Sequence, residues 1–353
     1  MGEVYDPTKP FNDQVRRLIQ ETHPKSGPIS VTPFGKRFKV SKFGRYWNEY
    51  DELTGTDGIG TKGLIHWMAG TIPYGVQDAF AMTADDLMEG GFEPVYLQDH
   101  LMMQEENESR IFEATMALRD LCIANPWSLF ETETYPIVIT GGETAIINTM
   151  QGFEMGITMT GYSSLTEQIV PNAKDGDVLI GLDSSGLHSN GYSFVRDEML
   201  GKRKMTLDDK LPWNVKVGEE LTIPTHVYTP ALKELLYDYK EDVHGMVHIT
   251  GGGLSKLKEL APSKDVDMHV ERSRAPVPQN IFFYLHELGC TEEKMYTRFN
   301  NGIGYVIAIT PESANAAVET LSKYFNACVI GKVAKGSGRA VIESAYSGKT
   351  LSY

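Results

Sequence analysis

Five short glycine-rich segments carry most of the side chains in this sequence that could do chemistry. Each combines glycine with hydroxyl or amide side chains, and most add a charged residue or a histidine. The segments are residues 55–63, 141–144, 184–191, 248–253 and 299–304. Glycine leaves backbone N–H groups open to approach, and phosphate oxygens bind to such groups and to Ser, Thr and Lys donors. One segment of this kind is an ordinary tight turn, but five together favour a phosphate-rich site.

The first segment matches two nucleotide-binding motifs only in part. In a P-loop the lysine precedes the hydroxyl residue, whereas Thr61 precedes Lys62 here, so the P-loop is rejected. Gly58, Gly60 and Gly63 fit the G-x-G-x-x-G spacing of dinucleotide-binding folds. That fold needs a buried strand before the glycines and a long crossover helix after them. Residues 47–52 do not read as a buried strand, and residues 64–69 are too few for the helix, so the match is weak. Lys62 is interpreted as a phosphate ligand because it lies inside a glycine-rich segment.

Several carboxylates lie in or beside apolar segments: Asp57, Asp85, Asp86, Asp99 and Glu143. Three such groups beside phosphate oxygens would bind Mg²⁺, which prefers oxygen ligands. The adjacent pair Asp85–Asp86 lies in the middle of a helical pattern, where two like charges are unfavourable unless a cation is near. The pair therefore favours a metal site.

Two histidines are candidates for proton transfer. His188 lies among Ser189, Asn190 and Gly191, and His248 precedes Thr250 and three glycines. A neutral imidazole can polarise a carbonyl or move a proton near pH 7. His244 could share a face with His248, but no third ligand is indicated and a zinc site is not expected.

The elements that must position these residues alternate between strands and helices, which predicts a layered α/β fold. Expected strands are residues 95–97, 135–140, 178–182 and 304–309. Expected helices are residues 79–89, 111–124, 229–239 and 311–325. The polar turn at residues 171–177 predicts a boundary between two domains, 1–170 and 171–353.

Composition excludes several classes of protein. The 353 residues include 33 basic and 47 acidic side chains, a net charge of −14, so binding to nucleic acid or to an anionic membrane is not expected. Cys122, Cys290 and Cys328 are odd in number and far apart, which argues against a disulfide framework. No signal peptide or apolar stretch long enough for a membrane span is evident, so we expect a cytoplasmic protein.

Taken in order, the segments resemble the phosphoribosylformylglycinamidine cyclo-ligase family of purine biosynthesis. Thr56 to Lys62 resembles the family's T-D-G-V-G-T-K, and Gly141 to Ala145 resembles G-G-E-T-A. Further similar stretches are residues 82–94, 184–193, 224–228, 248–253 and 299–304. The resemblance covers about residues 34–343.

The sequence also departs from the family pattern. Asp85 replaces the family's Asn, and Thr297 and Arg298 are exchanged. Of the family's N-terminal glycine-rich lid, only residues 25–27 and Phe34–Gly35 are candidates, and residues 344–353 are unmatched.

The resemblance implies an ATP-dependent ring closure of formylglycinamidine ribonucleotide to aminoimidazole ribonucleotide, with release of ADP and phosphate. It implies a homodimer in which N-terminal ATP-binding domains join their sheets, each followed by a C-terminal α/β sandwich domain. ATP and Mg²⁺ are the expected cofactors, with K⁺ as a further candidate.

The residues expected in the site fall into four groups. Mg²⁺ would be held by Asp57, Asp86 and Glu143. ATP would also contact Gly58, Gly60, Thr61, Lys62 and Gly142. Substrate would contact Ser189, Gly191, Thr250, Gly251, Gly252 and Asn300. Catalysis would involve His188, Asn190 and His248.

Two alternatives stay open at this point. The superfamily also contains selenophosphate synthetase, thiamine-monophosphate kinase, the large amidotransferase-dependent synthetase of the same pathway and a hydrogenase maturation protein. A catalytically silent ATP-binding subunit with the same fold is the other alternative.

Overall fold

A computed structural model describes residues 10–34, 37–129 and 133–353 of the chain. The chain divides into two compact units. Unit 1 comprises the residues up to Leu87 together with Phe92–Thr166, and unit 2 comprises Met88–Gly91 together with Glu167–Tyr353. Each unit has its own sheet and helices, so the two are described in turn. The functional labels predicted for residues 1–170 and 171–353 stay predictions.

Unit 1 is built on a four-stranded sheet of order β3-β6-β4-β5. Strands β3 and β4 both pair with β6 in antiparallel fashion, whereas β4 and β5 run parallel. The strands are β3 Tyr50–Gly58, β4 Glu93–Met103, β5 Val138–Ile146 and β6 Phe153–Ser164. The remaining elements are α1 Pro10–Gln20, the hairpin β1 Ile29–Phe34 with β2 Arg37–Lys42, η1 Arg45–Glu49, α2 Lys62–Ala69, α3 Ile72–Glu89 and α4 Glu108–Ala124.

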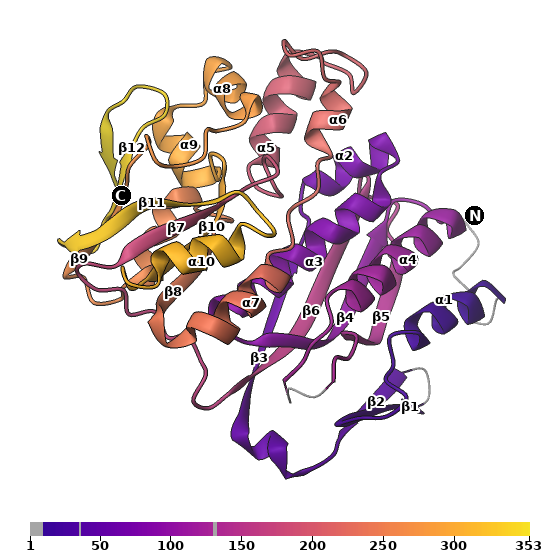
Figure 1. Ribbon diagram of the computed structural model, residues 1–353. Coiled ribbons are helices and arrows are strands. Elements are labelled where there is room, and N and C mark those ends of the chain that lie inside the picture. The colour runs from indigo at the N-terminus through magenta and orange to yellow at the C-terminus, as the bar shows by residue number, and fades with distance from the viewer. Residues whose placement is uncertain (1–9, 35–36, 130–132) are drawn as a thin grey trace. The chain divides into compact units, whose positions relative to one another are not determined.

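One face of this sheet is covered by helices α2, α3 and α4 (Figure 1). Alternation along β4 explains the arrangement, because Leu97 and Leu101 are buried while Gln98 and His100 are exposed. Helix α4 begins where the side chain of Asn107 accepts a hydrogen bond from the N–H of Arg110. The other sheet face carries Gln98 and His100 of β4 together with Thr54 and Thr56 of β3.

Unit 2 contains a seven-stranded sheet of order β13-β12-β9-β11-β7-β10-β8. All neighbours are antiparallel except β12 and β9. The strands are β7 Val178–Asp183, β8 Val243–His248, β9 Val266–Val270, β10 Ile303–Ile309, β11 Ala327–Lys335, β12 Ala340–Glu343 and β13 Thr350–Ser352. The helices are α5 Tyr192–Val195, η2 Arg196–Lys202, α6 Val217–Leu221, α7 Thr229–Tyr239, η3 Lys240–Asp242, η4 Gly253–Leu260, α8 Asn280–Glu287, α9 Glu292–Arg298 and α10 Ala314–Leu321.

Strand β10, which lies between β7 and β8, is buried along its whole length. Ile307 and Tyr305 pack with residues of α7 and α10, whereas Val306 and Ala308 pack with residues of η4 on the other face. A strand covered on both faces reads as a continuous apolar run, which is why the sequence predicted it well.

The layered α/β prediction is confirmed, and the expected elements differ mainly at their ends. Helix α3 begins at Ile72 rather than at residue 79, and β5 begins at Val138, just after Pro136, which cannot donate to a ladder. Residues 141–144, which could have been a turn, lie inside strand β5. The unmatched tail forms β13 at the sheet edge.

Among the described residues, no helix is long and apolar enough to cross a membrane. Of the candidate lid residues, Gly35 lies outside the described residues, whereas residues 25–27 lie just before β1.

Candidate functional site

The first glycine-rich segment of unit 1 connects strand β3 to helix α2. Its backbone N–H groups are already bonded: the N–H of Gly58 donates to Asp57 Oδ1 at 2.7 Å, and that of Gly60 donates to Glu154 Oε1 at 3.0 Å. Gly60 has the left-handed φ of +57° that glycine adopts readily. The oxygens of a bound anion can accept hydrogen bonds from these two N–H groups only if the carboxylates of Asp57 and Glu154 move away. Sequence reasoning missed Glu154, which carries no motif.

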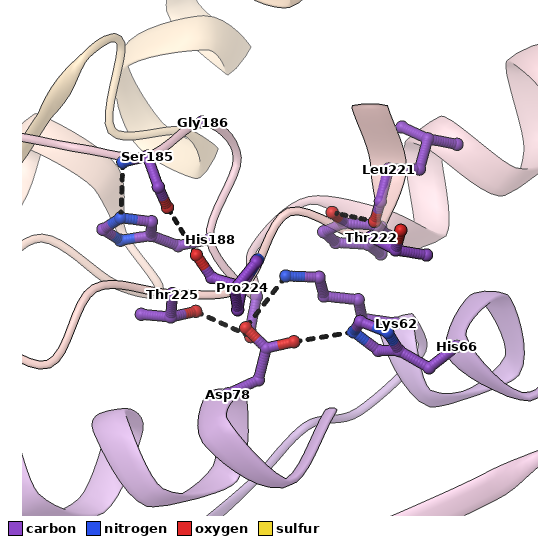
Figure 2. A network of polar contacts seen from close by, with 12 residues as sticks. Lys62, His66, Asp78, Ser185, Gly186, His188, Leu221, Thr222, Pro224 and Thr225 are labelled. Carbon is purple, nitrogen blue, oxygen red and sulfur yellow. Dashed lines mark hydrogen bonds and ion pairs between the residues drawn. The ribbon is translucent and has the colours of Figure 1, made fainter. Parts of the chain in front are cut away.

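Lys62 does not reach into open space as a phosphate ligand would. Its Nζ lies 2.9 Å from Asp78 Oδ1, and His66 Nε2 lies 2.8 Å from Asp78 Oδ2 (Figure 2). All three side chains are buried. Burial lowers the pKa of Lys62 and the pKa of His66, while Asp78 acts in the opposite direction. Asp78 and His66 were not among the predicted site residues, since neither belongs to a motif.

The predicted magnesium ligands are not assembled in advance. Asp86 is half-buried on α3, and Glu143 is exposed on β5. Within the described ranges, no three His, Cys, Asp or Glu side chains are grouped so that they could hold a metal ion. The roles of Asp57, Asp86 and Glu143 at Mg²⁺ stay predictions.

A cavity of about 500 Å³ lies in unit 1 beside the second segment. Its lining includes Gly142 and Glu143 of β5, Asp99 of β4 and Arg16 of α1. Asp99 pairs with Gly142 across the parallel ladder, and a Cβ atom on Gly142 would lie 2.2 Å from Asp99 Oδ1. Burial raises the pKa of Asp99 to about 7, and the negative charge of Glu143 adds to the effect.

In unit 2, the third and fifth segments are bonded to each other through Asn300. Its amide oxygen accepts from Ser184 Oγ at 2.9 Å and from the N–H of Gly302 at 2.9 Å, and its Nδ2 donates to the carbonyl of Gly186 at 2.8 Å. These bonds give Asn300 a positioning role. Its predicted contact with substrate stays a prediction.

His188 is held by these segments with a defined proton position. It is buried, has a φ of +56°, and its Nε2 lies 3.2 Å from the N–H of Ser185 (Figure 2). Because a backbone N–H can only donate, Nε2 must accept, so the proton of the neutral ring is on Nδ1. Gly304 makes room for the ring, since a Cβ atom there would lie 2.7 Å from His188 Cε1 and 1.9 Å from Tyr228 Oη.

The structure brings the two candidate histidines together within unit 2. The ring centres of His188 and His248 are 6.4 Å apart, and His248 stacks on Tyr305 at 5.7 Å. His226, which had no predicted role, lies 6.0 Å from His188. This spacing is too long for direct proton transfer between His188 and His248.

The fourth segment ends strand β8 and adjoins the third. A Cβ atom on Gly251 would have Asn190 Oδ1 as its nearest atom, at 3.9 Å, and Ser189 Oγ lies 3.3 Å from Thr225 Oγ1. Gly252 takes a φ of +101°, so the turn depends on glycine. The predicted catalytic and substrate-binding residues of unit 2 are therefore close in space.

Two charged residues that carried no motif hold this turn. Lys256 Nζ donates to the carbonyl of His248 at 3.0 Å and to Thr250 Oγ1 at 3.2 Å. Glu89 Oε1 accepts from the N–H of His248 at 2.6 Å and lies 3.7 Å from Lys256 Nζ. Sequence spacing gave no signal for Glu89, because it comes 159 positions before its partner.

Comparison with known proteins decides the family. Residues 174–343 match the family described as AIR synthase related protein, C-terminal domain. A phosphoribosylformylglycinamidine cyclo-ligase of Bacillus cytotoxicus is 34% identical over 348 residues, which cover 93% of this chain and 92% of the relative. One of Methanobrevibacter smithii is 34% identical over 79% of this chain and 78% of its own length. The chain belongs to the phosphoribosylformylglycinamidine cyclo-ligase family.

The cyclo-ligase family shares its fold with more distant solved structures. E. coli HypE, a hydrogenase maturation protein, has a TM-score of 0.64 at 15% identity and covers 97% of this chain and 96% of its own. Thiamine-monophosphate kinase from Stenotrophomonas maltophilia has a TM-score of 0.61 at 16% identity and covers 96% of each chain. At these identities the likeness concerns the fold alone. The resemblance to the cyclo-ligase family seen in the motifs is confirmed.

Proposed function

We propose that this chain closes the imidazole ring of 5-aminoimidazole ribonucleotide from formylglycinamidine ribonucleotide, with ATP converted to ADP and phosphate. Relatives of the cyclo-ligase family match this chain over most of its length. The structural observation that carries the proposal is in unit 2. There, three glycine-rich segments distant in sequence converge on His188, Asn190 and His248.

The chemistry requires an activated oxygen. An amide oxygen is a poor leaving group, so its phosphorylation by ATP must precede ring closure. The amidine nitrogen then attacks the activated carbon, and phosphate leaves with the former amide oxygen. The protein must hold two phosphorylated reactants in line and balance their charge.

The residues of unit 2 suit the substrate side of this reaction. His188 is neutral with its proton on Nδ1, so it can donate a hydrogen bond to a carbonyl or phosphoryl oxygen. Thr250, Gly251 and Gly252 form a tight turn that would cradle a phosphate, and Asn190 lies beside Gly251. Ser189, the neighbour of Asn190 in sequence, would contact the substrate with it. His248 is the second candidate for moving a proton. Gly191, the last residue of segment 184–191, is assigned to the substrate.

ATP is assigned to unit 1. The cavity beside Gly142 and Glu143 has room for part of a nucleotide, and Arg16 contributes a positive charge to its lining. A relative in fold, HypE, has been solved in complex with ATP. We assign Gly58, Gly60, Thr61 and Gly142 to the phosphates. Lys62 was expected to join them, but its Nζ is paired with Asp78.

The metal assignment rests on the chemistry of the donors. Asp57, Asp86 and Glu143 offer the carboxylate oxygens that Mg²⁺ prefers, and phosphate oxygens and waters would complete the ligand set. When bound, Mg²⁺ neutralises the charge of the triphosphate. The residues present therefore suit Mg²⁺ together with a nucleotide, and K⁺ is retained as a second candidate cation.

A homodimer in the cytoplasm completes the proposal. The open face of the unit 1 sheet carries Thr54 and Thr56 of β3, which are hydrogen-bonded to Thr160 and Thr158 of β6. We propose that the partner's sheet joins the unit 1 sheet at this face.

The test is the release of ADP in the presence of formylglycinamidine ribonucleotide, with the product identified by mass. The proposal predicts ADP and aminoimidazole ribonucleotide in equal amounts, and no ADP when the substrate is omitted. Thiamine monophosphate and selenide serve as control substrates for the other superfamily activities. Binding of ATP without turnover of any substrate would instead support the silent subunit.

A further inference from the structure

Lys62, Asp78 and His66 form a buried charged cluster, here called the anchor cluster, within unit 1. Lys62 is the first residue of α2, His66 lies one turn later, and Asp78 lies on α3. Asp78 binds both partners, one through each carboxylate oxygen, at 2.9 and 2.8 Å. A carboxylate bound at both oxygens fixes the relative position of the two helices that contribute the cluster.

The protons of the cluster follow from its contacts. An ionised carboxylate only accepts hydrogen bonds, so His66 Nε2 carries a proton and donates it to Asp78. His66 Nδ1 lies 2.8 Å from Thr71 Oγ1, and in the neutral ring with its proton on Nε2 it accepts from that hydroxyl. The ring is neutral, in agreement with the lowered pKa of His66 that burial causes. One positive charge, on Lys62, faces one negative charge, on Asp78.

The position of the cluster in the chain gives it a consequence beyond packing. Lys62 directly follows Gly58, Gly60 and Thr61, whose turn is proposed to bind ATP phosphates. On the other side of the turn, Gly60 is bonded to Glu154 of β6. The start of α2 is also pressed against β6, because a Cβ atom on Gly63 would lie 1.9 Å from the carbonyl oxygen of Phe153.

We infer that Asp78, supported by His66, positions the phosphate-binding turn by holding Lys62, and that Lys62 is an anchor of this turn rather than a phosphate ligand. The inference rests on the proposed function, which assigns this turn to ATP. Removing either charge of the pair releases the same end of α2. Asp78 and His66 are thus positioning residues for the nucleotide.

The two roles of Lys62 make opposite predictions for Asp78→Asn. If Lys62 is an anchor, Lys62→Met and Asp78→Asn each weaken Mg–ATP binding about tenfold, because both break one pair. Their combination then weakens binding by much less than the roughly hundredfold product of the two single effects, because both substitutions break the same ion pair. If Lys62 is a ligand, Asp78→Asn leaves ATP binding unchanged or tighter.

The measurement is the dissociation constant of Mg–ATP by titration calorimetry on the full-length variants, with KM values for both substrates. The anchor predicts a higher Kd and KM for ATP with an unchanged KM for formylglycinamidine ribonucleotide. A Kd in Asp78→Asn equal to that of the wild type would overturn the inference. Independent, multiplicative effects of the two substitutions would overturn it as well.

Asp78→Asn leaves the buried ammonium of Lys62 without its counter-charge and can fail to fold. The double variant removes both charges and avoids that problem, and His66→Gln perturbs the cluster without changing its charge. A Kd unchanged in both would also refute the anchor. His244→Gln is the matched control, since His244 Nδ1 forms a similar pair with Asp177 at 2.8 Å in unit 2. It should lower thermal stability and leave ATP binding unchanged.

The outcome also separates the inference from the proposed function. A wild-type chain that binds no Mg–ATP contradicts the proposed function. A wild-type chain that binds Mg–ATP and an Asp78→Asn variant that binds it equally well contradict the anchor alone.

Discussion

Individual residues in this chain often do something other than their motif suggests. Lys62 lies in a phosphate-binding pattern, yet its charge is paired with Asp78. Asn300 lies in a glycine-rich segment, yet its side chain joins two segments. A motif records which residue types occur together along the chain, whereas a buried charge takes the partner that the fold provides.

Asp86→Asn tests the metal assignment at a single position. Loss of one carboxylate ligand should lower kcat at least about tenfold with little change in thermal stability, since Asn has nearly the same shape. Asp85→Asn is the control on the same helix, because the family resemblance has Asn there, and it should stay within a few-fold of wild type. The measurement is kcat from steady-state kinetics at saturating Mg²⁺. Equal activity of wild type and Asp86→Asn would remove Asp86 from the metal site.

Asp99 predicts a pH dependence of stability. Its pKa in the folded chain is about 7, above the value of 3.8 for an ordinary Asp, so the folded state binds more protons between these values. Ionising Asp99 therefore lowers the free energy of unfolding as pH rises from about 4 to 7, and the loss is complete above 7.

Asp99→Asn should remove this penalty. We expect the variant to gain about 1–3 kcal/mol over wild type at pH 8 and less at pH 5. Thermal or urea unfolding at the two pH values measures the difference. An equal difference at both values would mean that Asp99 is ionised throughout.

At the scale of elements, the sequence predicted what local pattern determines. Helix α7 and strands β7 and β10 lie where periodicity placed them, because their residues alternate or repeat with the element's own period. The glycines inside β3 and β5 were not recognised as strand residues. Glycine is needed there because atoms of neighbouring strands leave no room for a side chain, and sequence pattern alone does not show these neighbours. In β5, Gly142 is required by Asp99 of the adjacent strand, and in β3, Gly58 is required by the carbonyl oxygen of Met155 in β6.

The contrast between local sequence pattern and contacts made on folding also explains how much of the site was predictable. His188, Asn190, His248 and Gly251 carried motif signals, and the fold brings them together. Asp78, Glu89, Glu154 and Lys256 carried none. Glu89 and Glu154 bond to segments that only folding brings near, whereas Asp78 and Lys256 bond to nearby segments without belonging to a motif.

Gly63→Ala tests whether packing outweighs helix propensity. Ala is the better helix former, but its Cβ would lie 1.9 Å from the carbonyl oxygen of Phe153. We expect a loss of about 2–4 kcal/mol in the free energy of unfolding, measured by urea denaturation. Gly156→Ala is the control in β6, because its nearest atom would be 3.9 Å away, and it should be neutral. Equal stability of the two variants would contradict the contact at Gly63.

At the scale of the whole molecule, the proposed homodimer can be tested by mass. Sedimentation should give about twice the chain mass of 39.3 kDa. A charge buried in the interface is costly, so Thr56→Arg on the open sheet face should shift the protein toward monomers. Tyr237→Arg, at an 83% exposed position on α7, is the matched control and should stay dimeric. A monomeric wild type would contradict the dimer.

The acidic composition has a related meaning at this scale. A net charge of −14 repels nucleotides at long range, so phosphate binding must depend on local donors. In the proposed site, Gly58 and Gly60 would supply such donors once the carboxylates of Asp57 and Glu154 move away from them, and bound Mg²⁺ would add the missing positive charge.

The central claim is that ATP activates an amide oxygen and that this oxygen leaves as phosphate. The most direct measurement supplies formylglycinamidine ribonucleotide labelled with ¹⁸O at the formyl oxygen, together with ATP, and analyses the released phosphate by mass. The account predicts one ¹⁸O atom in the inorganic phosphate for each aminoimidazole ribonucleotide formed. Phosphate without the label, or ADP release without ring closure, would contradict it.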